Sequence, residues 1–189
     1  MPIGSNGMFL NSKFIIIAQM KVHFIITGGT IDSTWDGTRD TAVVLPESVI
    51  PSYLEKIRLY NEVDFSVVFM KDSRDVNDED RQSLLKIIEE SPDKNFIVTH
   101  GTYTMPDTAK FIQSNLKRND ATIVLTGSMT PLKGFDMSDA GFNLGFAFSK
   151  VQDLEAGVYL CMNGRVFSAE EAAKSLSEGK FYSIFSEKQ

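Results

Sequence analysis

Three short loops rich in hydroxyl groups and glycines each follow an apolar run of the chain. They are Thr27-Gly28-Gly29-Thr30, Thr99-His100-Gly101-Thr102 and Thr126-Gly127-Ser128-Met129. Glycines let a backbone turn sharply and approach a ligand closely. Threonine and serine hydroxyls can bind a substrate or, with a base beside them, attack it. One such loop is common in α/β proteins, but three in succession predict a shared crevice.

The loops can share a crevice only if the elements before them lie in one sheet. Apolar runs that predict strands occur at 22–26, 65–69, 96–99, 122–125 and 158–162. They alternate with stretches that predict helices, at 46–60, 78–90, 106–116 and 138–151. This alternation is typical of a doubly wound, flavodoxin- or Rossmann-like α/β fold, in which helices cover both faces of a parallel sheet. Ligands of such sheets bind beyond the carboxyl ends of the strands, where the three loops are expected.

The ends of the elements carry further signals. Pro46 and Pro106 suit the first turn of a helix, where a missing N–H group costs nothing. Segment 33–43 contains Gly37 and few apolar residues, so an exposed loop is expected there.

We interpret residues 20–189 as a single domain and residues 1–19 as an extension or the product of an upstream start. The apolar run 14–18 follows Lys13 and alternatively suggests an export signal. It is short for that purpose, and no clear cleavage site separates it from the next strand.

Charge and composition narrow the class of partner. The 189 residues carry a net charge of −6 and a pI near 5.0, without a basic stripe, which argues against nucleic acid or an anionic membrane surface. The single cysteine, Cys161, excludes an internal disulfide or a cysteine-based metal cluster and suits a reducing cytosol. Two histidines are too few for a typical zinc site, and no P-loop or complete dinucleotide fingerprint occurs. We therefore expect a small-molecule ligand, with no metal and no cofactor.

Several polar residues near the strand ends also have structural interpretations. Ser73 could cap a turn, and Asp75 or Asn77 could cap the helix that follows. His100 is expected to tie loops together rather than act as a base, because no acidic partner is evident. Lys133, beside a glycine, is expected in solvent.

Five motifs, in order and spacing, resemble the L-asparaginase family. VHFIITGGTIDS at 22–33 and THGTYTM at 99–105 are similar to the two signatures of that family. The other matching stretches are KDSRDVND at 71–78, VLTGSM at 124–129 and SDAGFNLGFA at 138–147. The resemblance is to the N-terminal, catalytic domain of the family. Since the chain stops soon after NGRVF at 163–167, we expect a short, single-domain branch.

The resemblance implies an amidohydrolase that hydrolyses the side-chain amide of asparagine or a related small amide. Thr30 is then the nucleophile and Thr102 a second catalytic threonine, while N–H groups of the glycine-rich turn stabilise the oxyanion. Ser73 would hold the substrate α-carboxylate. The implied substrate site as a whole comprises Gly29, Ser73, Arg74, Gly101, Tyr103 and Ser128. We further expect a cytoplasmic homodimer, because a crevice at strand ends needs cover to exclude water.

Two positions depart from the family pattern. Tyr103 stands where an aspartate would grip the substrate α-ammonium, and Ala121 stands at the expected position of a lysine that would activate a threonine. Losing both removes an acid–base relay worth ~10²–10⁴-fold, so weak hydrolysis of asparagine is expected. The two side chains should lie together in a pocket that favours ligands without an ammonium group. Lys133 is the candidate to replace the lysine, and Trp35 is the only aromatic residue in the loop that often supplies an assisting tyrosine.

Two other functions remain open. A non-catalytic member of the family could bind a small ligand or assemble with a partner. A phosphate-bearing ligand is the second alternative, since hydroxyl-rich turns after parallel strands also cradle phosphates in flavodoxin-like proteins. Ammonia release from L-asparagine, ligand-dependent stabilisation without turnover, and a phosphate-dependent thermal shift distinguish the three.

Overall fold

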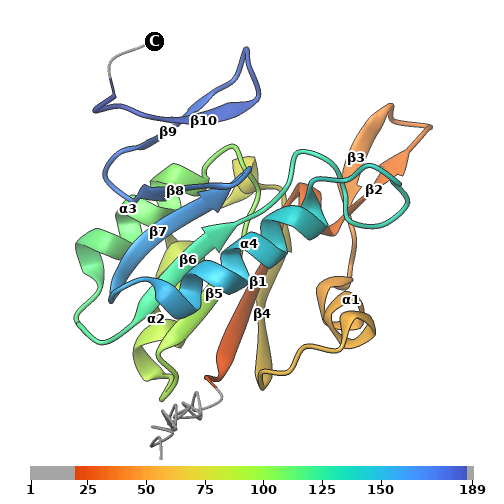
Figure 1. Ribbon diagram of the computed structural model, residues 1–189. Coiled ribbons are helices and arrows are strands. Elements are labelled where there is room, and N and C mark those ends of the chain that lie inside the picture. The colour runs from red at the N-terminus through yellow and green to blue at the C-terminus, as the bar shows by residue number, and fades with distance from the viewer. Residues whose placement is uncertain (1–19, 187–189) are drawn as a thin grey trace, which may run out of the picture.

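A six-stranded sheet runs through the middle of the molecule in the computed structural model, which describes residues 20–186 (Figure 1). Its strand order is β4 (Val63–Lys71), β1 (Val22–Gly28), β5 (Asn95–Thr99), β6 (Thr122–Thr126), β7 (Gly157–Met162) and β8 (Arg165–Ser168). Neighbouring strands are parallel except β8, which turns back antiparallel to β7. The expected doubly wound α/β sheet is confirmed, with one antiparallel strand added. The expected extension, residues 1–19, lies outside the described residues.

The register of the central strands places the three glycine-containing loops at one edge of the sheet. Ile26 of β1 is aligned with Thr99 of β5, which is aligned with Thr126 of β6. On its other side β1 pairs with β4, so the turn after β4 reaches the same edge. Strands β1 and β6 are buried along their whole length, as expected of a sheet that is covered on both faces.

Helices cover both faces of the sheet, as the sequence predicted. Helices α2 (Asp78–Glu90) and α3 (Met105–Asn115) pack on one face, and α1 (Ile50–Ile57) and α4 (Ala140–Asp153) pack on the other. The buried side chains are Leu84, Leu85, Ile88, Ala109 and Ile112 on the first face, and Ile50, Leu54, Leu144 and Val151 on the second. Among residues 20–186, none of the helices has both the length and the apolar character that crossing a membrane requires.

Local signals explain where the helices begin. The Asn77 side chain accepts the N–H of Asp80 at 2.9 Å, and the Asp80 carboxylate accepts the Asn77 N–H at 3.1 Å, which is a capping box for α2. Pro106 lies in the first turn of α3 as predicted. Helix α1 begins later than expected, so Pro51 rather than Pro46 occupies its first turn.

The segment predicted as an exposed loop, 33–43, forms a β-hairpin instead. Strands β2 (Ser33–Asp36) and β3 (Thr41–Val44) pair antiparallel. Asp36 stabilises the turn between them, because its carboxylate accepts the backbone N–H of Thr38 at 2.9 Å and the hydroxyl at 2.7 Å. The loop prediction was wrong because each strand is only four residues long and β2 contains a single apolar residue, Trp35.

A second hairpin, for which the sequence analysis predicted no strands, follows the main sheet. It consists of β9 (Ala172–Ser175) and β10 (Lys180–Ser183), and forms a two-stranded sheet of its own. Phe181 lies opposite Lys174 in this pair and packs with its ring centroid 6.5 Å from that of Phe167 in β8. The hairpin therefore attaches to the core through aromatic packing rather than by extending the sheet.

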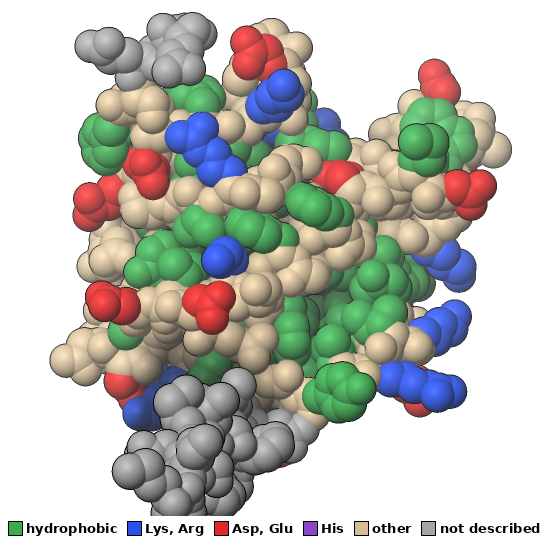
Figure 2. Space-filling model, viewed as in Figure 1, with side chains coloured by type: hydrophobic (Ala, Val, Ile, Leu, Met, Phe, Trp, Pro, Cys, Tyr) green, Lys and Arg blue, Asp and Glu red, His purple; other side chains and the backbone are tan. Residues whose placement is uncertain are grey.

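One face of the edge strand β4 is only partly covered. Helix α4 packs mainly against β5, β6 and β7. Phe65 and Val67 of β4 are 37% and 57% exposed. Figure 2 shows hydrophobic side chains gathered on this face between α4 and α1.

Candidate active site

Close backbone contacts bring together the loops that follow β1, β4 and β5, at the carboxyl ends of these strands. Gly29, which follows β1 and has φ of 81°, packs so tightly that a Cβ atom there would overlap the Gly101 backbone. Gly101, which follows β5, lies in turn against Ser73, and a Cβ atom at position 101 would stand 2.6 Å from Ser73 Oγ. Ser73 begins the 3₁₀ turn η2 (Ser73–Asp75) that follows β4. Only glycine fits at both positions, so the residues that follow them converge.

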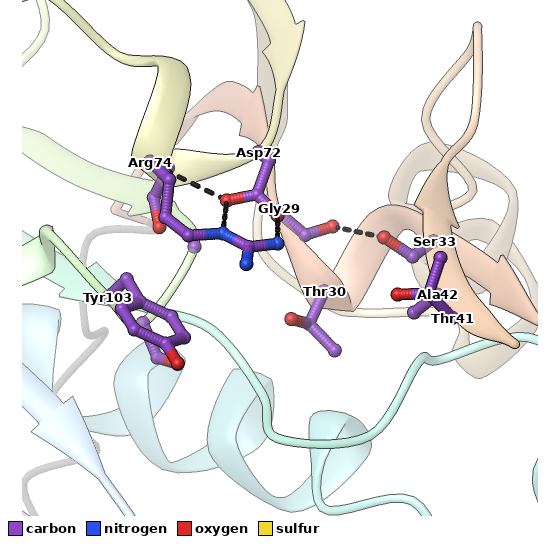
Figure 3. A pocket seen from close by; sticks show the side chains of 11 residues that line it. Gly29, Thr30, Ser33, Thr41, Ala42, Asp72, Arg74 and Tyr103 are labelled. Carbon is purple, nitrogen blue, oxygen red and sulfur yellow. Dashed lines mark hydrogen bonds and ion pairs between the residues drawn. The ribbon is translucent and has the colours of Figure 1, made fainter. Parts of the chain in front are cut away.

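The loops enclose a crevice with a cavity volume of about 100 Å³. Thr30, Ser73, Thr102 and Tyr103 line it together, as the sequence predicted, although they come from three separate loops. The complete lining is Gly29, Thr30, Ser33, Thr41, Ala42, Asp72, Ser73, Arg74, Gly101, Thr102 and Tyr103. Figure 3 shows Tyr103 and Arg74 on one side of the crevice and Thr30 facing them. The crevice therefore offers several hydroxyl groups to a small ligand.

The β2–β3 hairpin forms the opposite wall. Ser33 Oγ donates a hydrogen bond to the Gly29 carbonyl at 2.9 Å, and Thr41 and Ala42 complete this side (Figure 3). The Gly29 N–H itself donates to the Lys71 carbonyl at 2.9 Å. The fold thus uses this N–H, so the expectation that the glycine-rich turn supplies oxyanion donors is wrong for Gly29.

An ion pair occupies the rim of the crevice. One carboxylate oxygen of Asp72 accepts the backbone N–H and Nε–H of Arg74, both at 2.9 Å, and the other accepts Nη2 at 2.6 Å. The Arg74 guanidinium holds the pKa of the Asp72 carboxyl below its usual range. Its Cζ also lies 5.3 Å from the centroid of the Tyr103 ring. Asp72 is therefore charged, and its charge is already neutralised.

A lysine that the sequence analysis missed lies against the second threonine. Lys174 Nζ, from β9, is 2.7 Å from Thr102 Oγ1 and 4.6 Å from the Tyr103 ring centroid. Burial lowers the pKa of the Lys174 ammonium. An amine with a depressed pKa beside a hydroxyl group is the arrangement of a general base.

The predicted position of the lysine, Ala121, was wrong. Ala121 immediately precedes β6 and is buried in the core that packs against α3. Tyr103 follows the carboxyl end of the neighbouring parallel strand β5. The two residues therefore lie at opposite ends of these two strands. The prediction assumed that the lysine immediately precedes β6, whereas Lys174 lies in β9. The turn around Gly179, with its φ of 61°, was the signal of a hairpin that could have drawn attention to Lys174.

Two other residues proposed for the site do not reach the crevice. Ser128 is fully buried, and its hydroxyl donates to the Thr130 carbonyl at 2.6 Å instead of lining the cavity. Lys133, the candidate replacement for the lysine, lines a separate hollow with Trp35 and Phe135. The predicted substrate contact of Ser128 and the predicted role of Lys133 therefore have no support in the geometry.

His100 has the structural role that the sequence predicted. It is fully buried, and its Nδ1–H donates to the Gly101 carbonyl at 2.8 Å because a carbonyl oxygen can only accept. Its Nε2 then accepts the hydroxyl of Thr108 in α3 at 3.1 Å. Burial lowers the pKa of His100 to about 4, so the imidazole is neutral at pH 7. His100 holds the loop after β5 against α3.

Comparison with known proteins identifies relatives across most of the chain. The family model described as "Asparaginase, N-terminal" matches residues 21–184. L-asparaginase 2 of Escherichia coli (strain K12) is 30% identical over 168 residues, which are 84% of this chain and 47% of that protein. Glutaminase-asparaginase of Acinetobacter glutaminasificans is 30% identical over 169 residues, 83% of this chain and 50% of that protein. The structure of the thermostable L-asparaginase from Thermococcus kodakarensis matches with a TM-score of 0.74 and 27% identity, over 87% of this chain and 51% of that one.

The chain spans about half the length of the relatives that it matches. Within that half, the family model extends from β1 through the loops of the crevice to the end of the β9–β10 hairpin, which carries Lys174. The shared sequence and the shared fold thus cover the elements that build the site. The chain belongs to the asparaginase family, and the part of the family that it matches is the N-terminal domain.

Proposed function

We propose that this protein is an amidohydrolase of the asparaginase type, which hydrolyses the side-chain amide of asparagine or a related small amide. The observation that carries the proposal is the contact between Lys174 Nζ and the hydroxyl of Thr102, which lines the same crevice as Thr30. A hydroxyl group is a weak nucleophile until a base takes its proton, and the crevice combines both groups. The names of the relatives, L-asparaginase and glutaminase-asparaginase, support the same chemistry.

In the proposed mechanism Thr30 is the nucleophile. Its hydroxyl oxygen forms a bond to the amide carbon, and its proton passes to the Thr102–Lys174 pair, directly or through one water. The C–N bond then breaks, its electron pair leaves with nitrogen, and the Lys174 ammonium returns the proton so that ammonia departs. The product of this half-reaction is an ester between Thr30 and the substrate acyl group.

Water completes the cycle by attacking the ester carbon. The neutral Lys174 amine accepts a proton from that water, the bond to the Thr30 oxygen breaks, and Thr30 regains its proton. The net reaction converts an amide and water into a carboxylate and ammonium. Burial favours this use of Lys174, because it lowers the pKa and so increases the fraction of neutral amine at a given pH.

Hydrolysis of L-asparagine itself is proposed to be weak. Lys174 restores the base that the sequence analysis counted as lost, so the acid–base relay lacks only its carboxylate. Tyr103 replaces that carboxylate and supplies an aromatic face and one hydroxyl group. The replacement of the carboxylate by Tyr103 therefore weakens the binding and orientation of a substrate that carries an α-ammonium group.

The experiment measures ammonia release by the purified protein from L-asparagine and L-glutamine, together with the intact mass of acid-quenched samples. An acyl adduct on Thr30, and loss of ammonia release in Thr30→Ala, support the proposal. Thr38→Ala is the matched control, because Thr38 lies in the turn of the β2–β3 hairpin outside the crevice. An adduct on Thr102 would exchange the roles of the two threonines.

A non-catalytic, ligand-binding member of the family is the second candidate, and the replacement of the aspartate by Tyr103 favours it. In that case small amides or carboxylates raise the melting temperature, no ammonia is released, and no adduct forms.

We also propose a cytoplasmic homodimer. Tyr103, in the lining of the crevice, is 50% exposed, so the mouth of the crevice is open to water on this chain alone. A second copy would cover it and strengthen the electrostatic interactions inside. The single cysteine, Cys161, is buried and unpaired among the described residues, which suits a reducing compartment. Sedimentation velocity tests the assembly: a monomer at all concentrations would contradict it.

A further inference from the structure

We propose that the crevice selects small monoamides that carry a carboxylate and lack an α-ammonium group, and that Tyr103 with the two cations over its ring determines this selection. The inference rests on the proposed amidohydrolase function and names its substrate class. It follows from the charges that surround the crevice.

Both cations at the crevice lie over the same aromatic ring. Lys174 Nζ is 4.6 Å and Arg74 Cζ is 5.3 Å from the Tyr103 centroid. The face of an aromatic ring attracts cations, and here protein side chains already occupy that position. A substrate ammonium that approaches Tyr103 would meet the Arg74 guanidinium and, whenever Lys174 is protonated, a second positive group, and it would gain no carboxylate partner. Like-charge contacts of this kind disfavour a ligand strongly.

Carboxylates that could receive an ammonium are already engaged. Asp72 is the one carboxylate in the lining of the crevice, and Arg74 binds both of its oxygens. Asp32, in the turn after Gly29, is fully buried and accepts hydrogen bonds from the Ser48 hydroxyl and the Val49 N–H, each at 2.9 Å. Arg74 therefore neutralises the Asp72 charge, and Asp32 lies outside the lining of the crevice, so neither offers an unpaired negative charge to a substrate ammonium.

Arg74 and Ser73 favour a ligand that carries a carboxylate. The Asp72 pair uses two of the five N–H donors of the Arg74 guanidinium and leaves three. The Ser73 hydroxyl lies in the same lining as Arg74. Positive charge and hydroxyl donors together recognise a carboxylate, while the cavity volume of about 100 Å³ restricts the ligand to a small molecule. A four-carbon monoamide without an amino group, succinamate, has this chemistry.

L-Asparagine and succinamate are a matched pair, because they differ only in the α-ammonium group. The test measures kcat/KM for ammonia release from both, and from butyramide, in which a methyl group replaces the carboxylate of succinamate. We expect kcat/KM for succinamate to exceed that for asparagine by about tenfold or more, and butyramide to be poorer than succinamate. Equal or better use of asparagine overturns the inference, and equal use of butyramide overturns the need for a carboxylate.

Three variants test the role of the ring and its cations. Tyr103→Asp supplies a carboxylate to Lys174 and to a substrate ammonium, so the ratio of the two kcat/KM values should shift towards asparagine. Arg74→Gln removes one cation and should shift the ratio in the same direction by less. Tyr103→Phe, the matched control, keeps the ring and should keep the ratio. An unchanged ratio in Tyr103→Asp overturns the assignment of specificity to position 103.

Binding measurements separate this inference from the proposed function. If none of the amides is hydrolysed but calorimetry shows tighter binding of succinamate than of asparagine, the proposed activity fails and the ligand class stands. If asparagine is hydrolysed in preference, the proposed activity stands and the inference fails. If succinamate neither binds nor reacts, both fail.

Discussion

Lys174 Nζ lies 2.7 Å from Thr102 Oγ1, although 72 positions of sequence separate the two residues. Thr102 follows β5 of the main sheet, and Lys174 belongs to the separate β9–β10 hairpin. The contact places an amine with a lowered pKa on a hydroxyl group that lines the crevice. It therefore ties the proposed chemistry to the docking of the hairpin on the sheet.

Replacing Lys174 should remove the base. We expect Lys174→Met, which keeps much of the apolar stem, to lower kcat for amide hydrolysis by ~10²–10⁴-fold, the usual contribution of a general base. Lys180→Met is the matched control, because Lys180 is an exposed lysine in the partner strand β10. Steady-state ammonia release, with circular dichroism to check folding, measures the effect. Full activity in Lys174→Met would exclude Lys174 as the base.

The pH dependence should reveal the same lysine. Because burial lowers the Lys174 pKa below 10.5, the neutral amine becomes available as pH rises, and kcat/KM should increase to an inflection below pH 10.5. In Tyr103→Asp the new carboxylate favours the ammonium form, so the inflection should move to higher pH. A profile of ammonia release against pH measures both. An inflection that stays in place in Tyr103→Asp would contradict contact between position 103 and the base.

Substitution of Gly29 and of Gly145 by alanine should change the free energy of unfolding in opposite directions. A Cβ atom at position 29 would overlap the Gly101 backbone at a positive φ, so Gly29→Ala should destabilise the fold by about 2 kcal/mol or more and disturb the crevice. Gly145 lies inside α4, where a Cβ atom meets nothing within 4 Å, so Gly145→Ala should stabilise by ~0.5–1 kcal/mol. Urea unfolding compares the two. A neutral Gly29→Ala would mean that the loops are not packed so closely.

His100 should make the stability depend on pH between about 6.5 and about 4. The folded state keeps the imidazole neutral with a pKa of about 4, whereas the unfolded chain takes up a proton below about 6.5. The stabilisation that comes from the neutral imidazole is complete above pH 6.5 and is lost as pH falls towards 4, about 3 kcal/mol in total. Urea unfolding at pH 7.5 and pH 4.5 should show a smaller loss for His100→Asn than for the natural protein. Equal losses would contradict the low pKa.

The main sheet could be predicted because its strands are long apolar runs. Residues Val22–Gly28 and Thr122–Thr126 are buried on both faces, and such runs are visible without any knowledge of the fold. Helix α2 matched its predicted bounds because the acidic residues after Asn77 mark its start. The hairpins were missed because their strands are only four residues long and partly exposed, so they form no long apolar run.

The candidate site was predictable where glycines fix the loops, and unpredictable where it depends on tertiary packing. Gly29 and Gly101 drew attention to Thr30 and Thr102, the family resemblance added Ser73, and the structure brings the three into one crevice. Near Lys174 the local signal is limited to Gly179 in the hairpin turn, and the position of the lysine depends on how that short hairpin docks against the loop after β5.

That hairpin is anchored by few contacts. Ala172 and Phe181 are buried in the core, and the Glu171 carboxylate accepts the Ser168 N–H and the Ser183 hydroxyl, both at 2.7 Å. Since β9 and β10 pair with one another and not with the six-stranded sheet, they can open as a local unit while the sheet stays folded. Their amide hydrogens would then exchange with solvent well before those of β1 or β6. The proposed base, Lys174, would move away from Thr102 in each such opening. Local unfolding of one hairpin, rather than the global stability of the fold, would then set the fraction of the protein that is competent for catalysis at any moment.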